Sequence, residues 1–324
     1  MRAVCKYLRL ARAFFCKKRA LNLIKSLVAY SFRNPEARPF PVFIQIEPTN
    51  RCDLKCPLCL TGNSRLKRSK GDMGFESFKK ILDELGDTAA YLVLYNLGEP
   101  LLNKDIFKMI GYAKEKRIYV RLSTNGYFND MSVIKGLVKA RLDELVVSLD
   151  CPDKESFLSY KGIDGFDTVK NNIKEIIKER GKKNTPFVSV QLLAMRQTEN
   201  RVADFKKIAA GLGADRVMIK PVRVNFPGGH SSRQYLPLKA RYIREAYKGK
   251  RKANCLRLWV SAGFLWDGSV VPCCFDMEGE QSFGNIRESA FKTIWNSQKY
   301  ASFRSRSLHN PHAICRECSL VSIF

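Results

Sequence analysis

The sequence predicts an α/β protein built on a parallel sheet, and two observations carry this prediction. First, six apolar runs rich in β-branched and aromatic residues alternate with segments of helical periodicity between residues 42 and 221. Second, the chain has 324 residues, 45% of them hydrophobic, which is enough for a barrel-sized domain and a small one. An open doubly wound sheet and a partial barrel both fit, and both collect functional residues at the carboxyl ends of the strands.

The elements of this alternating region follow from the same periodicities. Alternation with helices favours parallel strands joined by right-handed crossovers. Strands are expected at residues 42–47, 91–96, 118–124, 143–150, 187–193 and 215–220. Helices are expected among them at residues 74–85, 103–116, 166–180 and 203–213.

Residues 1–41 form a basic segment that precedes the first strand. Residues 1–34 predict an amphipathic helix or helix pair, and the proline-rich stretch 33–41 ends it. We expect its apolar side to pack on the main domain; the alternative is a helix that docks on anionic lipid. The predicted apolar stripe consists of Tyr7, Leu10, Ala11, Phe14, Leu21, Ile24 and Val28, and the basic face of Arg2, Arg9, Arg12 and Arg19.

The overall charge and the cysteine content restrict the class of protein. With 57 Lys and Arg against 31 Asp and Glu, the net charge of +26 suits an acidic partner, although a well-solvated basic surface explains it equally. No secretory signal is recognisable, so a cytoplasmic location is expected, with membrane association as an option. In that reducing compartment the 11 cysteines are expected to be metal ligands or catalytic thiols.

The C-terminal third changes character. Residues 222–254 are expected to be a linker, and residues 258–274 a hairpin that turns at Asp267-Gly268. A last helix is expected at about 288–303. The domain prediction is therefore 1–41 helical segment, 42–221 core, 222–254 linker and 255–324 C-terminal domain.

Cys52, Cys56 and Cys59 form a C-x3-C-x2-C pattern directly after the first predicted strand. Three thiolates packed so closely can each bind one iron of a cubane cluster. The fourth iron then stays open for a substrate, as in catalytic zinc sites with three protein ligands. A structural zinc site with a distant fourth ligand, or a loop without metal, are the alternatives.

These residues make the chain resemble the radical S-adenosylmethionine (radical SAM) enzymes. Further family-like motifs follow the next three strands in order: "LGEP" at 97–100, "STNG" at 123–126 and "SLD" at 148–150. Two departures are mild, since Leu58 stands where the family often has an aromatic residue and Leu97 replaces a glycine. The resemblance implies a partial (β/α)6 TIM-like barrel over residues 42–221.

The resemblance also implies a cofactor and a reaction. Cys52, Cys56 and Cys59 would hold a 4Fe-4S cluster whose open iron chelates SAM, and reductive cleavage of SAM would give a 5′-deoxyadenosyl radical that takes a hydrogen atom from substrate. A donor such as flavodoxin or ferredoxin would supply the electron, and the clusters would make the enzyme oxygen-sensitive. By position, the SAM-contacting residues would be Gly98, Glu99, Ser123, Asn125, Ser148 and Asp150.

A second cysteine set, Cys255, Cys273, Cys315 and Cys318, is spaced C-x17-C-x41-C-x2-C. Four thiolates make a closed zinc or iron–sulfur site. The set resembles the short ("twitch") form of the SPASM domain, with Gly268 as its glycine, and implies one auxiliary 4Fe-4S cluster. Cys274 is an alternate for Cys273, and a structural zinc ribbon is the alternative to the cluster.

The cysteine spacing looks most like a radical SAM dehydrogenase of aminocyclitol antibiotic biosynthesis. The leading prediction is therefore oxidation of an alcohol or carbohydrate-type metabolite, with the auxiliary cluster accepting an electron. The alternatives are a peptide- or protein-modifying maturase, an RNA-modifying enzyme, or a zinc-containing nucleic-acid-binding protein. The substrate is expected to be a small molecule or peptide, and an anionic one would be in keeping with the charge. Nucleic acid is disfavoured because the basic residues form no recognisable RNA module.

Overall fold

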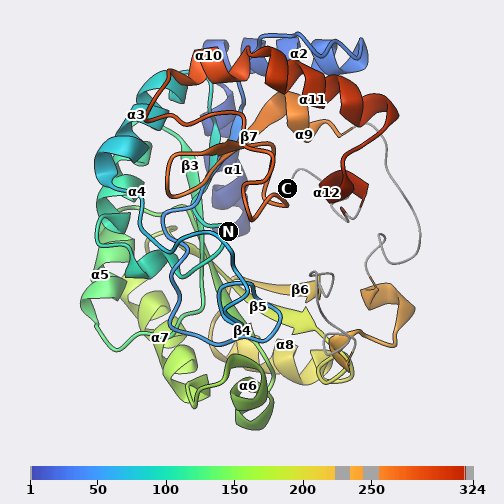
Figure 1. The fold of residues 1–324 in the computed structure, drawn as a ribbon. Coiled ribbons are helices and arrows are strands. Elements are labelled where there is room, and N and C mark those ends of the chain that lie inside the picture. The colour runs from blue at the N-terminus through green and yellow to red at the C-terminus, as the bar shows by residue number, and fades with distance from the viewer. Residues whose placement is uncertain (1, 223–233, 244–254, 317, 319–324) are drawn as a thin grey trace.

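The structure is a computed structural model and describes residues 2–222, 234–243, 255–316 and 318. Its centre is a single sheet with the strand order β6-β5-β4-β3-β2-β1-β7-β8 (Figure 1). The first six strands are parallel and neighbour one another in chain order. In a doubly wound sheet the strand order would reverse midway, so the partial barrel is the alternative that is confirmed. They are β1 Phe43–Ile46, β2 Tyr91–Val93, β3 Tyr119–Thr124, β4 Glu144–Asp150, β5 Phe187–Ala194 and β6 Arg216–Pro221.

Helices connect these strands and lie around the outside of the curved sheet (Figure 1). The four predicted helices are present, although α4 begins three residues late because Pro100–Leu102 forms the 3₁₀ helix η1. Two short helices, α5 and α6, were not predicted. The outer helices are α3 Phe75–Leu85, α4 Ile106–Glu115, α5 Ser132–Lys139, α6 Lys154–Lys161, α7 Phe166–Arg180 and α8 Val202–Gly211.

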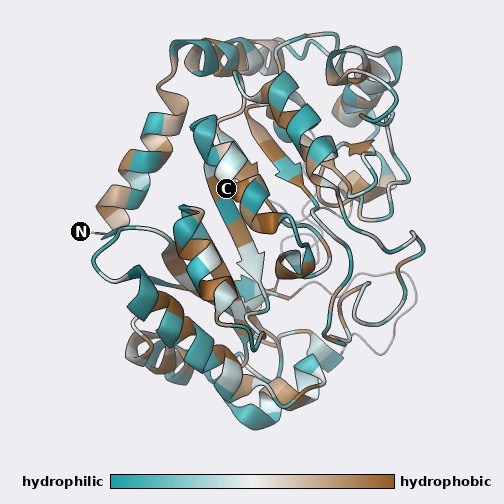
Figure 2. Ribbon diagram, turned by 90° about the vertical axis from the view of Figure 1, so that its left-hand side faces the viewer, coloured by the Kyte–Doolittle hydropathy of each residue, from teal (hydrophilic) through white to brown (hydrophobic). Residues whose placement is uncertain are grey.

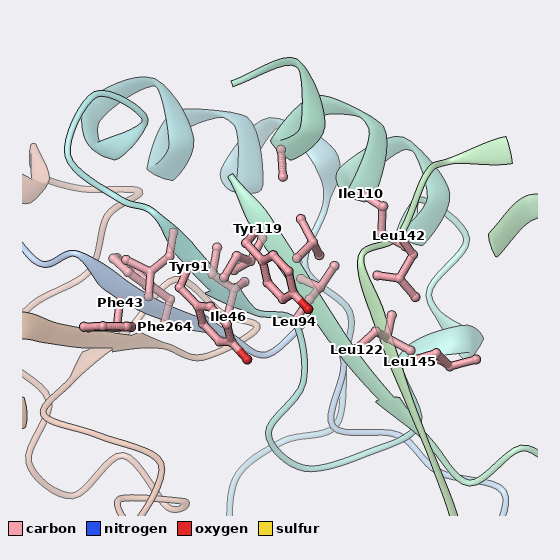
Figure 3. Close-up of a cluster of buried hydrophobic side chains, with 14 of the residues drawn as sticks. Phe43, Ile46, Tyr91, Leu94, Ile110, Tyr119, Leu122, Leu142, Leu145 and Phe264 are labelled. Atoms are coloured by element: carbon pink, nitrogen blue, oxygen red, sulfur yellow. The ribbon is translucent and has the colours of Figure 1, made fainter. Parts of the chain in front are cut away.

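The core lies between the sheet and these helices. Figure 3 shows aliphatic side chains of the strands facing helix α4. Leu122, Leu145 and Ile110 are fully buried, and burying such a side chain stabilises the fold by roughly 1.5–3 kcal/mol. Tyr91 and Tyr119, on neighbouring strands, stack with ring centroids 5.3 Å apart. This packing holds the strand ends, and therefore the loops that follow them, in fixed register.

The C-terminal residues extend the same sheet. Strand β7 (Ser261–Phe264) pairs in parallel with β1, and β8 (Val270–Val271) pairs antiparallel with β7, so the predicted hairpin is present as part of the barrel sheet. Its first predicted residues form the helix α9 (Arg257–Val260) instead. In place of the predicted last helix there are two helices, α10 (Phe291–Trp295) and α11 (Gln298–His309). They are separate because Ser297 caps the start of α11, where its side chain accepts from the Tyr300 N–H. A short helix, α12 (Ala313–Arg316), follows.

Most of the predicted linker, at 223–233 and 244–254, lies outside the described residues, and between these two stretches Ala240–Tyr242 forms a 3₁₀ helix. The predicted helix pair at the N-terminus is α1 (Arg2–Phe14) and α2 (Lys17–Ser31). In Figure 1 α1 lies behind the sheet, whereas the loop after β1 lies in front. Helix α1 therefore lies at the end of the barrel opposite to the cysteine loop. No helix among the described residues is long and apolar enough to span a membrane.

The predicted packing of this helix pair is wrong in part. Leu10 and Phe14 do contact the core, but Tyr7, Leu21 and Ile24 are 48–61% exposed. The inward face of α1 is basic instead, because two buried carboxylates need cations at the amino end of β4. Lys6 Nζ lies 2.9 Å from Glu144, and Arg9 Nε lies 3.5 Å from Asp143.

Candidate functional site

The cysteine loop runs from β1 to α3 and holds Cys52, Cys56 and Cys59 at the carboxyl end of the strands, each half-buried. The Cys59 N–H donates to the Cys56 carbonyl at 3.1 Å, and the Leu54 N–H donates to Cys52 Sγ at 3.5 Å. Burial raises the pKa of Cys52 to about 12 and that of Cys56 to about 11. A metal that binds these sulfurs must therefore displace their protons.

Two glycines allow backbone to lie close to the cysteines, Gly98 from the loop after β2 and Gly62 from the cysteine loop itself. Gly98 has φ +76°, and a Cβ atom there would lie 2.5 Å from the Thr49 carbonyl oxygen and 2.7 Å from that of Arg51. A Cβ at Gly62 would lie 2.6 Å from the Cys56 nitrogen. Gly98 is thus placed against the cysteine loop, and only glycine fits its backbone conformation and its close contact.

Glu99 joins the loops that follow β1, β2 and β3. Its N–H donates to the Arg51 carbonyl at 2.7 Å, and its carboxylate accepts from Thr124 Oγ1 at 2.8 Å and from the Asn125 N–H at 2.7 Å. Asn125 Nδ2 in turn donates to Asp53 of the cysteine loop at 2.8 Å. Burial raises the pKa of Glu99 to about 7, although the backbone N–H donors oppose the shift. Two of the predicted SAM-contacting residues therefore belong to one network.

Ser148 and Asp150 lie side by side at the end of β4, where the strand pairing is interrupted. Gln191 Nε2 on β5 donates to Ser148 Oγ at 3.2 Å and to Asp150 Oδ1 at 3.0 Å. Ser123, the remaining predicted residue, is half-buried on β3 and pairs in register with Val146 of β4. Of two other residues at the last strands, Lys220 is half-buried on β6 and Arg223 lies outside the described residues.

Lys161 is a site residue that the sequence did not reveal. Its Nζ lies 2.5 Å from Asp150 Oδ2, and both side chains are only 4% exposed. Its carbonyl accepts from the Lys55 N–H of the cysteine loop at 3.4 Å. Burial alone would lower the pKa of Lys161, but Asp150 and Cys56 outweigh burial and raise it. Lys161 therefore holds a positive charge beside the thiols and occupies one oxygen of Asp150.

The second cysteine set is gathered at the C-terminal region. Cys255 precedes α9, Cys273 follows β8, and Cys315 and Cys318 lie in and after α12. Burial raises the pKa of Cys315 to about 12, with further contributions from Cys255 and Cys318. It also raises the pKa of Cys273, to which Cys255 and Cys318 contribute as well. Such contributions are expected between neighbouring thiols. The alternate, Cys274, interacts with Cys273 and with Tyr95 of the barrel.

Neither thiol group is arranged for a single ion. Within the described ranges, no three His, Cys, Asp or Glu side chains form the ligand set of one metal ion. A cubane makes a different demand, because each thiolate bonds a different iron. Two separate sets, of three and of four thiols, fit such clusters by the chemistry of their donors.

A buried ion pair connects the cysteine loop to the C-terminal region. Glu47, at the end of β1, is fully buried and accepts from both terminal nitrogens of Arg68 at 2.9 and 3.0 Å. Arg68 Nε donates to the Met277 carbonyl at 2.6 Å, and the Trp266 N–H donates to Glu47 at 3.3 Å. The two cysteine-bearing regions are therefore held together by a satisfied buried pair.

Similar curated proteins share about a quarter of their residues with this chain. A tungsten-containing aldehyde ferredoxin oxidoreductase cofactor-modifying protein of Pyrococcus furiosus is 25% identical over 317 residues, covering 86% of this chain and 87% of that protein. A PqqA peptide cyclase of Granulibacter bethesdensis is 25% identical over 289 residues, covering 80% of this chain and 76% of that protein. The subtilosin biosynthesis protein AlbA of Bacillus subtilis is 25% identical over 282 residues, covering 80% and 60%.

Solved structures share the fold at lower identity. Streptococcus suis SuiB bound to S-adenosylmethionine superposes with a TM-score of 0.66 at 16% identity, covering 86% of this chain and 72% of SuiB. SuiB bound to its precursor peptide SuiA gives a TM-score of 0.65 at 15% identity, covering 92% and 75%. BtrN in complex with AdoMet and 2-DOIA gives 0.54 at 20% identity, covering 87% and 94%.

Family models match both parts of the chain. The radical SAM superfamily model matches residues 46–209, about half of the chain, and contains the cysteine loop and the strand ends described above. The model of the SPASM iron–sulfur cluster-binding domain matches residues 255–319, which contain the second cysteine set. The chain therefore belongs to the radical SAM superfamily and carries a C-terminal SPASM iron–sulfur domain.

Proposed function

We propose that this radical SAM enzyme modifies a peptide or protein substrate. The observation that carries the proposal is the similarity to PqqA peptide cyclases and AlbA over four fifths of the chain. The fold shared with SuiB in complex with a precursor peptide agrees with it. The leading sequence prediction, oxidation of an alcohol, becomes the second candidate, which the fold shared with BtrN supports.

Cys52, Cys56 and Cys59 would hold the SAM-binding 4Fe-4S cluster. When bound, cluster and SAM supply reductive cleavage to a 5′-deoxyadenosyl radical. The chain's own residues shape the surroundings: Lys161 places a buried positive charge near Cys56, and Glu99 fixes the loop that carries Asn125. All six predicted SAM contacts stay proposals: Gly98, Glu99, Ser123, Asn125, Ser148 and Asp150. At Asp150 a ribose hydroxyl would have to compete with Lys161 or Gln191.

Cys255, Cys273, Cys315 and Cys318 would hold one auxiliary 4Fe-4S cluster. A closed set of four thiolates leaves no position for substrate, which favours electron transfer. The net change in the peptide would then be the loss of two hydrogens, one as an atom to the radical and one as a proton and an electron. Flavodoxin or ferredoxin would supply the electron that begins each turnover.

The substrate is proposed to carry an anionic group, because the net charge is +26 and cations gather at the amino end of the barrel strands. Arg121 shares a face of β3 with Ser123, and Glu144 shares a face of β4 with Ser148, since side chains alternate along a strand. Three cations surround the single carboxylate of Glu144: Lys6 at 2.9 Å, Arg216 at 2.6 Å and Arg121 at 3.8 Å. This cluster lies at the amino end of β4, away from the cysteine loop, so a carboxylate of a peptide side chain would be attracted to its excess positive charge from a distance.

The cluster assignment predicts a definite iron content. After anaerobic reconstitution, the wild type should hold about eight irons and the Cys52/Cys56/Cys59→Ala variant about four. A Cys255/Cys273/Cys315/Cys318→Ala variant should also hold about four. About four irons in the wild type, falling to none in the first variant, would leave the C-terminal set without a cluster.

The substrate class is tested by 5′-deoxyadenosine formation. The reconstituted enzyme, with SAM and with dithionite as reductant, is supplied with a synthetic peptide pool rich in Asp and Glu or with a pool of cyclitols and sugars. We expect the peptide pool to raise 5′-deoxyadenosine above the substrate-free level, with a mass loss of two hydrogens in the modified peptide. Stimulation by the alcohol pool alone would replace this proposal with the second candidate.

A further inference from the structure

Helix α1 presents an apolar face to solvent on the side away from the barrel. Val4, Tyr7, Leu8 and Phe15 recur at helical spacing along α1 and just past its end, and they are 60%, 61%, 54% and 82% exposed. This face is possible because the opposite face uses Lys6, Arg9 and Ala13 for its contacts with the barrel. Figure 2 shows α1 along the outer flank of the molecule, with α2 crossing its top.

Helix α2 is built in the same way. Leu21, Ile24, Leu27 and Val28 are 40–57% exposed, and Phe32, at the C-cap, is 81% exposed. Its inward face is held by the buried Arg19, which donates to the carbonyl oxygens of Ala13, Gly86, Lys116 and Arg117 at 2.6–2.9 Å. Two consecutive helices therefore turn apolar side chains outward and anchor themselves through cations.

A basic hollow adjoins the apolar face of α1. Its volume is about 730 Å³, and Phe15 lies on its lining together with Arg12. The other charged groups that line it are Arg9, Lys114, Arg117, Arg141 and Asp143. The single carboxylate is already paired with Arg9 and Lys114. Arg12, Arg117 and Arg141 are exposed, and no ion pair is recorded for them within the described part of the chain.

We propose that α1 and α2 dock the enzyme on the surface of an anionic lipid bilayer. The apolar side chains would enter the boundary between headgroups and acyl chains, and the hollow would accept headgroup phosphates. Charge decides the occupant: residues 1–35 contain no acid, and four of their nine Lys or Arg are exposed and form no ion pair among the described residues, namely Arg12, Lys17, Lys25 and Arg33. These free cations complement anionic lipid. A second copy of this chain, with a net charge of +26, would be repelled instead. The helices lie on the bilayer, because they have only 13 and 15 residues.

Vesicle co-sedimentation of the reconstituted enzyme tests the proposal at about 0.15 M salt, where distant charges are screened. The wild type should pellet with phosphatidylglycerol–phosphatidylcholine vesicles and stay in solution with phosphatidylcholine alone. Leu8→Gln/Phe15→Gln/Ile24→Gln removes apolar area without changing charge, and Arg12→Gln/Arg117→Gln/Arg141→Gln removes three cations from the hollow. Each triple variant should bind about tenfold more weakly or worse.

Matched controls separate this face from general properties of the chain. Met131→Gln/Leu158→Gln/Leu238→Gln alters side chains of comparable exposure elsewhere, and Lys174→Gln/Lys206→Gln/Lys207→Gln removes three exposed cations from α7 and α8. Both should bind like the wild type. The proposal would be overturned if the Leu8/Phe15/Ile24 variant bound the anionic vesicles as well as the wild type. It would also be overturned if the Lys174/Lys206/Lys207 control lost binding. Two further outcomes would contradict it. The wild type could bind neither kind of vesicle, or it could form an oligomer without vesicles that the Leu8/Phe15/Ile24 variant does not form.

Discussion

At the scale of single residues, the candidate site depends on side chains whose buried charges are compensated in pairs. Asp150 has a positive φ of 62° at an interrupted strand end, and Lys161 and Gln191 together occupy both of its oxygens. Burying a carboxylate and an ammonium costs several kcal/mol each unless both are paired and hydrogen-bonded. The pair therefore fixes α6 to β4 beside the cysteine loop. Either residue buried without the other would destabilise the folded state.

Replacing Lys161 with Met should destabilise the iron-free chain by about 3–5 kcal/mol, because Asp150 would stay buried without its cation. The control is Lys154→Met on the same helix, which breaks an ion pair of similar length with Asp167 whose side chains are 66% and 48% exposed. That control should cost little, because solvent screens an exposed pair. Urea unfolding followed by circular dichroism measures both, and equal losses would show that the burial of the Lys161 pair carries no extra weight.

At the scale of elements, the sequence predicts what periodicity and strand ends reveal. All six barrel strands and the positions of Cys52, Gly98 and Asp150 at strand ends are found where the alternation and motifs placed them. Helix α6 was missed because its apolar spacing is weak, although Asp153 caps its start by accepting from the Ser156 N–H and Gly162 ends it at φ +77°. Because α6 was not predicted, the place of Lys161 beside the cysteine loop was not predicted either.

Contacts between distant segments are the part that the sequence did not predict. The placement of β7 beside β1, the Glu47–Arg68 pair and the basic inward face of α1 each join residues far apart in the chain. An amphipathic pattern shows two faces but not which one is buried, and here buried carboxylates at the foot of β4 reversed the usual choice.

Arg68→Leu tests the junction between the cysteine loop and β7. Glu47 would stay buried with no cation, so a loss of about 3–5 kcal/mol is expected at pH 8. Burial already raises the pKa of Glu47, and Arg68 opposes that shift. Without Arg68 the folded pKa rises further above the unfolded value, so the variant binds a proton on folding and regains stability as the pH falls.

The deficit of this variant relative to wild type should therefore shrink between pH 8 and pH 5. Lys70→Leu, an exposed cation of the same loop, serves as the control and should show a small deficit that does not vary with pH. Urea titrations at both pH values measure the difference. A deficit that is constant or grows toward low pH would show that Glu47 is not the group left uncompensated.

At the scale of the whole molecule, the two proposed sites lie at opposite ends of the barrel. The thiols and the proposed SAM contacts lie at the carboxyl ends of the strands, whereas α1 covers the amino ends and carries the proposed bilayer-binding face (Figure 1). The SPASM region is continuous with the barrel through the β1–β7 pairing and the buried Glu47–Arg68 pair. The chain should therefore unfold as one cooperative unit rather than as two domains.

The distribution of tryptophan makes this cooperativity measurable. All three tryptophans, Trp259, Trp266 and Trp295, lie in the SPASM region, whereas most of the helix lies in α1–α8 around the barrel. In urea, tryptophan fluorescence therefore reports the SPASM region, and circular dichroism at the helical band reports mainly the rest. For the iron-free chain we expect the two urea midpoints to coincide, because strand β7 cannot detach from the sheet without exposing β1 and the Glu47 carboxylate.

The Arg68→Leu variant should lower both midpoints together. A fluorescence transition at clearly lower urea than the helical one would mean that the SPASM region opens independently and that the β1–β7 junction does not couple the two parts.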